Sequence, residues 1–195
     1  MTNNDNNRYS QQNLDAIAEH FRAILELLGE DPNREGLLKT PQRAARALLY
    51  NTYGYEQEPA QIIHSAIFAH PGSEMVIVKD IEFYSLCEHH VLPFFGTISV
   101  GYIPDGKIVG LSKIARIVNT FSRRLQVQER LTSQVCDLLT QELSSLGVIV
   151  YCRAQHLCMK MRGVEKQSSS TVTIQYSGAF KDIALRNEFL AMIGE

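Results

Sequence analysis

The chain has 195 residues, of which 45% are hydrophobic and 21% are charged, and its net charge is −2 at pH 7. A chain of this length suits one domain, or one domain with a small appendage, and can bury a sizeable hydrophobic core. The slightly acidic balance argues against nucleic acid and anionic membranes as partners, and the sequence has no apolar run near the roughly 18 residues that a membrane-spanning helix needs.

The chain begins with the polar segment MTNNDNNRYSQQN, which lacks the apolar core of a secretory signal. We therefore expect residues 1–12 to be disordered and the protein to be cytoplasmic, where cysteines stay reduced. The four cysteines are then core residues or metal ligands and not a disulfide framework.

Helical patterns dominate the next part of the chain. Apolar residues recur at helical spacing over residues 11–28. Thr40 followed by Pro41 is typical of an N-cap and a first helical position, and predicts a second helix over residues 40–53. A third, shorter helix is expected over residues 59–68. None of these segments carries obvious chemistry.

The composition then changes to strand patterns that frame two helices. Strands are predicted in MVIVKDIEFYSLCEHH and FFGTISVGYIP, helices over residues 112–121 and 126–145, strands in GVIVYCRAQHLCMKMRG and STVTIQYSG, and a closing helix in ALRNEFLAMI. The order β-β-α-α-β-β is that of an α+β fold and not of alternating βαβ units. We expect a helical region over residues 13–70 and an α+β domain over residues 71–195.

The first strand ends in SLCEHH, which places a cysteine and two histidines beside apolar residues. Cys87 and His90 form a C-x-x-H pair, the right size for a short-range zinc clip. The pair alone is a weak signal, because a core cysteine with histidines at a strand end explains it equally well.

A second group strengthens the case for a metal. His156 and Cys158 are two apart in a predicted strand and so share a face with Lys160 and Arg162, while Met159 and its apolar neighbours are expected to face the core. One cysteine from this strand would complete a Cys₂His set suited to catalytic zinc.

The remaining histidines and cysteines then acquire expected roles. His89 and His156 are left for acid–base work near neutral pH. Cys136 lies in the apolar pattern of its helix, and six residues of strand would hold Cys152 roughly 20 Å from Cys158. Both of these cysteines are therefore expected to be structural.

Two further segments are ambiguous on residue type alone. Ser112 is a candidate N-cap with Lys113 and Arg116 nearby, an arrangement that suits an anion but is more often a capped helix with a solvated basic face. Gln128 and Glu129 stand among arginines, where a salt-bridged surface residue is the usual interpretation.

The motifs SLCEHH, GLSKIARI, RRLQVQERLT and HLCMKMRGV, in this order, resemble the GTP cyclohydrolase I family over nearly the whole chain. The resemblance implies one Zn²⁺ per subunit, held by Cys87, His90 and Cys158, with His89 and His156 moving protons. It implies that Glu129, with Gln128 beside it, recognises guanine. The triphosphate contacts that it implies are Ser112, Lys113, Arg116 and Arg162.

The family also implies a fold, an assembly and a reaction. The β-β-α-α-β-β core resembles the tunnelling fold, whose sheets join between subunits into a barrel, here in a homodecamer with active sites at subunit interfaces. The implied reaction is that of a cyclic amidine hydrolase: GTP and water give 7,8-dihydroneopterin triphosphate and formate, the first step of tetrahydrofolate, pterin or deazapurine biosynthesis.

Two alternatives remain open from the residues. One is a related tunnelling-fold enzyme, such as a pterin synthase or a nitrile reductase with a cysteine nucleophile. The other is a zinc-stabilised nucleotide- or pterin-binding module without catalysis, in which His89 or His156 would close the metal site as a fourth ligand.

Overall fold

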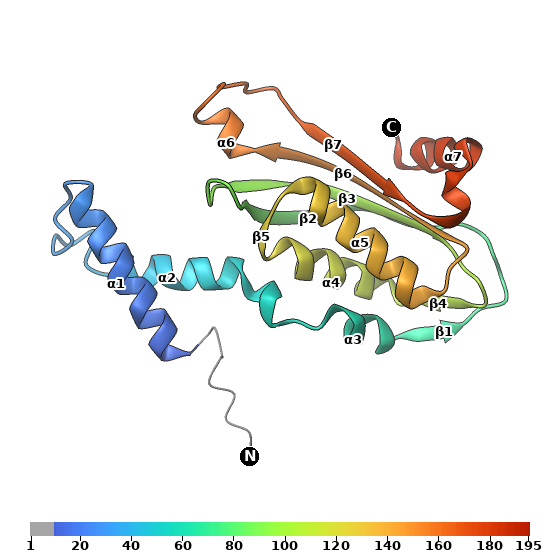
Figure 1. The fold of residues 1–195 in the computed structure, drawn as a ribbon, viewed down its shortest axis with the longest axis horizontal. Coiled ribbons are helices and arrows are strands. Elements are labelled where there is room, and N and C mark those ends of the chain that lie inside the picture. Colours follow the sequence, from blue (N-terminus) through green and yellow to red (C-terminus); the bar gives the residue numbers. More distant parts are fainter. Residues whose placement is uncertain (1–9) are drawn as a thin grey trace, which may run out of the picture. The chain divides into compact units, whose positions relative to one another are not determined.

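The computed structural model describes residues 10–195, and its contacts divide the chain into two compact units, Met1–Glu56 and Gln57–Glu195 (Figure 1). None of the helices in the described part of the chain is both long and apolar enough to span a membrane.

The first unit is helical, as predicted. It contains α1 (Gln11–Leu27), α2 (Thr40–Asn51) and the short 3-10 helix η1 (Tyr53–Glu56). Residues 1–9 of the segment expected to be disordered lie outside the described residues, whereas α1 already begins at Gln11, with the Ser10 side chain accepting a hydrogen bond from Asn13 N at 3.2 Å. The prediction of disorder was therefore wrong for residues 10–12.

The start of α2 differs in one detail from the expectation. Lys39 is the N-cap and Thr40 is already helical, with Pro41 following it. The Thr40 hydroxyl donates to Gly36 O at 3.4 Å and caps nothing in its own helix.

The second unit alternates strand pairs with helices. Its elements are α3 (Pro59–His64), β1 (Ile67–Ala69), β2 (Val76–Cys87), β3 (Pro93–Ile103), β4 (Lys107–Val109), α4 (Leu111–Ser122), β5 (Leu125–Gln126), α5 (Gln128–Leu143), β6 (Gly147–His156), α6 (Leu157–Lys160), β7 (Thr171–Tyr176), η2 (Gly178–Lys181) and α7 (Ile183–Ile193). The predicted α+β class and the order of the long strands and helices are confirmed. Composition placed the start of the catalytic domain at residue 71, but α3 packs on α4 and α5 within this unit.

Five strands form a mixed sheet in the order β5-β2-β3-β6-β7. The long strands pair antiparallel, and only the two-residue β5 runs parallel to its neighbour β2. β1 and β4 form a separate two-stranded sheet. Asp105 and Gly106 lie between β3 and β4, with Gly106 at a φ of 75° that glycine adopts without strain.

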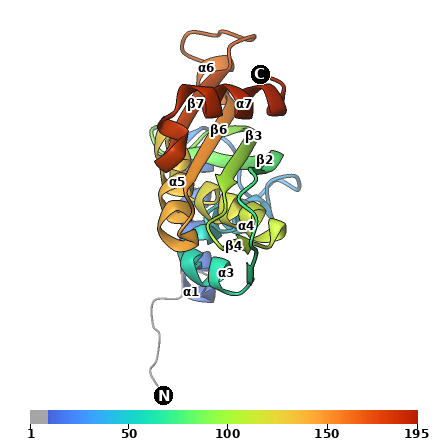
Figure 2. The same ribbon diagram turned by 90° about the vertical axis from the view of Figure 1, so that its right-hand side faces the viewer.

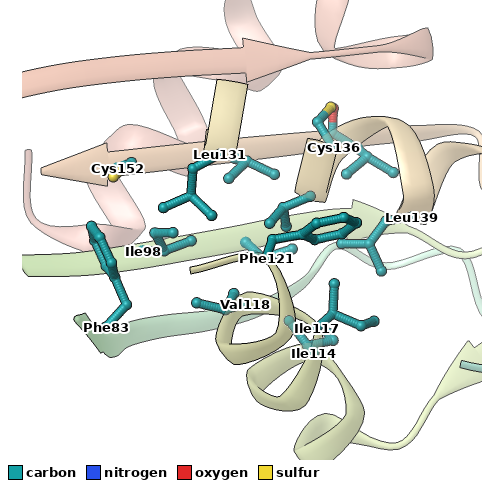
Figure 3. Packing of buried hydrophobic residues seen from close by; sticks show 14 of the residues in the cluster. Phe83, Ile98, Ile114, Ile117, Val118, Phe121, Leu131, Cys136, Leu139 and Cys152 are labelled. Carbon is teal, nitrogen blue, oxygen red and sulfur yellow. The ribbon is translucent and has the colours of Figure 1, made fainter. Parts of the chain in front are cut away.

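The helices α4 and α5 cover one face of the five-stranded sheet, and α7 crosses the other face near one end (Figures 1 and 2). Even-numbered residues of β3 and β6, such as Ile98 and Val150, face α4 and α5 in the main core. Figure 3 shows Ile98 and Phe83 of the strands opposite Leu131 and Val118 of the two helices. Odd-numbered residues such as Ile149 pack with Phe189 of α7 instead.

A β-bulge changes which residues of β2 reach the main core. The register against β3 shifts between Val78 and Ile81, and Asp80 adopts a φ of 57°. Before the bulge Val78 faces the main core, and after it the odd-numbered residues do so, ending at Cys87. Because side chains alternate across a strand, the extra residue moves Cys87 to the face that α4 and α5 cover.

Candidate metal centre and active-site pocket

The SLCEHH motif forms a tight turn at the end of β2. Cys87 O accepts hydrogen bonds from His90 N at 3.3 Å and Val91 N at 2.8 Å, and Cys87 N donates to Leu92 O at 2.8 Å. The turn brings His90 Nδ1 to 3.9 Å from Cys87 Sγ. It also forces Val91 to a φ of 53°, which strains a β-branched residue.

The segment that carries the third candidate ligand is not a continuous strand. β6 ends at His156, and the chain turns into the short helix α6, which contains Cys158 (Figure 1). The expectation that His156, Cys158 and Arg162 share one strand face was therefore wrong. Met159 and Met161, expected to face the core, are exposed.

The turn of the chain at His156 assembles the predicted ligand set. The ligand atoms of Cys87, His90 and Cys158 all lie within 4.8 Å of one another. A tetrahedral zinc with bonds of about 2.3 Å to sulfur and about 2.0 Å to nitrogen sets such atoms about 3.5 Å apart, so this donor set fits zinc. In the part of the chain that the structure describes, the group contains three residues, the number of protein ligands that a catalytic zinc has. His89, whose Nδ1 also lies 3.9 Å from Cys87 Sγ, is outside this group.

The surroundings of the Cys158 thiol disfavour its ionised form. The pKa of the Cys158 thiol is raised by burial first and then by the adjacent Cys87, while the positive charge of Arg162 opposes the rise. A bound divalent cation would stabilise both thiolates.

The other two cysteines are structural, as expected. Cys136 and Cys152 lie in the main core. Burial raises the pKa of Cys136 to about 11 and that of Cys152 to about 12. Thiols of this kind stay protonated and unreactive at neutral pH.

A cavity of about 230 Å³ opens beside the ligand set. It is lined by Cys87, His89, His90, Gln126, Val127, Gln128, Glu129, His156, Cys158, Met159 and Thr171. Residues that are up to 84 positions apart in sequence (171 − 87) thus meet at one end of the sheet, where β2 and β6 end and α5 begins.

His156 lies on the helix-covered face of the sheet, in line with Ala154 of β6. Its ring stacks on Phe94, with centroids 4.7 Å apart and an interplanar angle of 2°, and its Nε2 lies 2.9 Å from Gln128 Oε1. Burial lowers the pKa of His156 and the carboxylate of Glu129 partly opposes this, so the neutral ring is favoured near neutral pH.

The second candidate proton carrier has a different environment. The His89 side chain is 65% exposed, and its Nε2 is 3.9 Å from the Glu88 carboxylate, which is itself ion-paired with Arg130. His89 therefore faces the open side of the pocket, whereas His156 is held in its wall.

Glu129 lies in the first turn of α5 and is exposed, but it lines the pocket. It is not the simple surface residue that its arginine neighbours suggested. Gln128, next to it, is buried at 1% exposure, and protein groups surround its side-chain amide. The sequence gives no sign of this burial, since a buried glutamine at the start of a helix has no distinguishing pattern.

Three predicted site residues lie away from the pocket. Ser112, Lys113 and Arg116 belong to the first half of α4, whose N-terminus follows β4. Only the C-terminus of α4 leads into β5 and the pocket, and twelve helical residues span about 18 Å. Gly110 and not Ser112 is the N-cap of this helix. The structure of one chain therefore does not bring these three residues to the metal ligands.

Comparisons with known proteins identify the family of the chain. The family model described as GTP cyclohydrolase I matches residues 17–194. A protein of Porphyromonas gingivalis named GTP cyclohydrolase 1 is 55% identical over 178 residues, 91% of this chain and 92% of the relative. A relative named GTP cyclohydrolase 1 in Bacteroides thetaiotaomicron is 55% identical over 93% of this chain and 92% of the relative. A relative named GTP cyclohydrolase 1 1 in Pseudomonas aeruginosa is 56% identical over 92% of this chain and 97% of the relative. The chain belongs to the GTP cyclohydrolase I family.

Proposed function

We propose that this chain converts GTP and water to 7,8-dihydroneopterin triphosphate and formate, at the start of tetrahydrofolate, pterin or deazapurine biosynthesis. The observation that carries the proposal is one pocket in a member of this family. In that pocket the Cys₂His group lies beside His156, which is held in the wall, and the carboxylate of Glu129.

GTP cyclohydrolase I is a zinc-dependent family, and the ion would be held by Cys87, His90 and Cys158, one per subunit. When bound, zinc supplies Lewis acidity that makes water nucleophilic near neutral pH. The pocket of about 230 Å³ beside the ligands would hold the reacting purine ring. A set of three protein ligands favours catalysis over the purely structural zinc module.

Two histidines would move the protons. His156, neutral and fixed in the pocket wall, is suited to exchange a proton with the imidazole ring of the purine at a nitrogen next to the attacked carbon. His89 lies on the open side of the pocket and would assist the later opening of the ribose ring.

Guanine would be recognised by Glu129. A carboxylate accepts hydrogen bonds from the ring N–H and the exocyclic amino group of guanine together, a pair that adenine does not offer. Gln128 was expected to share this role, but its amide is occupied by protein groups, so we assign recognition of the base to Glu129.

The triphosphate would be bound by Arg162 of the same chain and by Ser112, Lys113 and Arg116 of a neighbouring copy. The second part of this assignment is supported by the length of α4, which separates those three residues from the metal ligands within one chain. It agrees with a homodecamer of tunnelling-fold subunits whose sheets join into a barrel and whose active sites lie at interfaces. We also propose a cytoplasmic location.

The reaction is tested directly with the purified, zinc-loaded protein. Incubation with GTP should release formate and give a product that fluoresces as a pterin after oxidation. If neither product forms, the proposed activity is wrong.

Recognition of the base is tested separately with Glu129→Gln. This change replaces one acceptor oxygen by a donor, which would face an N–H donor of the bound guanine. Because polar groups that are buried in a complex without a partner cost a few kcal/mol, kcat/KM for GTP should fall roughly 100-fold. Gln61→Glu, a distant surface change in α3, is the matched control. An unchanged kcat/KM in Glu129→Gln would show that Glu129 does not recognise the base.

A further inference from the structure

The side-chain amide of Gln128 is held in one orientation. Its Nε2 lies 3.2 Å from Cys152 O, 3.0 Å from Thr171 O and 3.1 Å from Thr173 Oγ1. Backbone carbonyl oxygens only accept hydrogen bonds, so the atom that faces two of them must be the amide nitrogen. A flipped amide would set its oxygen against both carbonyls.

The hydroxyl groups nearby support the same orientation. Thr132 Oγ1 donates to Gln128 O at 2.8 Å, so its proton is committed. Thr173 Oγ1, which is 2.6 Å from Thr132 Oγ1, must then donate to Thr132 and accept from Gln128. Each of these two hydroxyl groups has one hydrogen to donate. Both hydrogens are used in these bonds, so the Gln128 nitrogen must be the donor to Thr173 Oγ1.

The orientation of Gln128 determines which nitrogen of His156 carries a hydrogen. Gln128 Oε1 faces His156 Nε2 at 2.9 Å, and an amide oxygen only accepts. His156 Nε2 must therefore be the protonated nitrogen. A neutral imidazole has one N–H, which leaves Nδ1 with a free lone pair. Stacking on Phe94 keeps the ring in this plane.

We propose that Gln128 is a positioning residue that holds His156 in its Nε2–H tautomer, so that Nδ1 is the atom that exchanges a proton with the substrate. The proposal rests on the proposed function for the identity of that substrate. A proton that arrives at Nδ1 gives the imidazolium, which still donates through Nε2 to Gln128. His156 can therefore accept and return a proton at Nδ1 without breaking its contact with Gln128.

The tautomer can be read directly in the full-length, zinc-loaded protein labelled with ¹⁵N-histidine. Magic-angle-spinning NMR at a pH of about 8, where an ordinary imidazole is neutral, distinguishes protonated from unprotonated ring nitrogens. The His156 signals are assigned by their loss in His156→Asn. We expect Nε2 protonated and Nδ1 unprotonated. A wild-type His156 with Nδ1 protonated would overturn the proposal without any need for a variant at Gln128.

Gln128→Met then tests whether Gln128 is the cause. This change keeps the volume but removes the acceptor, so we expect Nδ1–H to appear in His156. The kcat for GTP should fall roughly tenfold or more, with little change in KM or zinc content, because a general acid–base group contributes about 10²–10⁴-fold. A His156 that remains fully Nε2–H in Gln128→Met would show that another group sets the tautomer.

Thr173→Val is the matched control. It removes one of the three acceptors around the Gln128 nitrogen but leaves both carbonyls in place, so the tautomer should not change. A changed tautomer in this variant would contradict the role of the carbonyls. Since the NMR measurement requires no turnover, an Nε2–H tautomer in a protein that makes no formate would refute the proposed function alone.

Discussion

The predicted site has a metal half, formed by the zinc ligands, and a phosphate half, formed by the triphosphate contacts, and the folded chain brings together the residues of the first half but not of the second. The metal half comes from the end of β2, the turn that follows it and α6, and its ligand atoms gather within 4.8 Å. The phosphate half, apart from Arg162, consists of Ser112, Lys113 and Arg116 in the first half of α4, a helix about 18 Å long whose other end leads to the pocket. Sequence motifs placed both halves in one site. The structure of one chain assembles only the first.

The difference follows from the topology. β2 and β6 both end at the same end of the sheet, so residues at their C-termini come together within one chain. α4 runs along the sheet, and its N-terminal residues lie away from that end. A motif that the family resemblance assigns to a site can therefore lie away from that site in one folded chain. Under the proposed assembly, a second copy would complete the site.

The largest effect is expected from a change in the metal half. Cys158→Ser should lose zinc and all turnover, because a hydroxyl is a far weaker zinc ligand than a thiolate. Cys136→Ala, which changes a core cysteine, should keep its zinc. Metal analysis and formate release measure both variants. A fully active Cys158→Ser protein without zinc would refute the metal assignment.

Co-expression of two inactive variants tests whether the halves come from different copies. Lys113→Ala and Cys158→Ser should each be nearly inactive, but mixed oligomers should recover up to about a quarter of the wild-type activity, since a quarter of randomly formed interfaces would carry no change.

The control for that experiment combines Lys113→Ala with Arg116→Ala, which alter the same half. This pair should recover nothing, because each copy then carries a damaged phosphate half. No recovery by the first pair, in oligomers shown to be mixed, would place both halves of the site in one chain.

Thiol reactivity should separate the ligand cysteines from the structural ones. The pKa values of Cys136 and Cys152, raised by burial to about 11 and about 12, lie well above pH 8, so both thiols should remain protonated and unlabelled there until the protein unfolds. Cys158 should react after zinc is chelated, faster as the pH rises, and should be protected by zinc. Mass spectrometry of peptides treated with iodoacetamide measures this. Labelling of Cys152 in the native protein would contradict its place in the core.

The smallest effect concerns the strained turn of the metal half. Val91→Gly should remove the penalty of a β-branched residue at a φ of 53° and change the free energy of unfolding by no more than about 1 kcal/mol, because the added freedom of the unfolded chain opposes the gain. Zinc should stay bound. Thermal unfolding of the zinc-loaded protein measures the change, and a large loss of stability would mean that Val91 contributes contacts rather than strain.

Periodicity in the sequence predicted the helices and long strands of this protein well, because spacing of 3.6 or 2 reflects which side of an element meets the core. The prediction failed at α6, since LCMKMR alternates as a strand does, yet Cys158 must turn away from the sheet to reach Cys87 and His90. The residue types of the ligand set were sufficient to suggest zinc. Their mutual geometry was not accessible from spacing alone.

The sequence by itself determined the types of the long helices and strands, the Cys₂His chemistry and the family, since these depend on residue identity and local order. The tertiary structure alone decided three further points. The bulge at Asp80 places Cys87 on the helix-covered face, the buried Gln128 contacts His156, and α4 keeps Lys113 apart from the metal ligands. Each of these depends on contacts between segments distant in sequence, and such contacts leave no periodic signal in the chain.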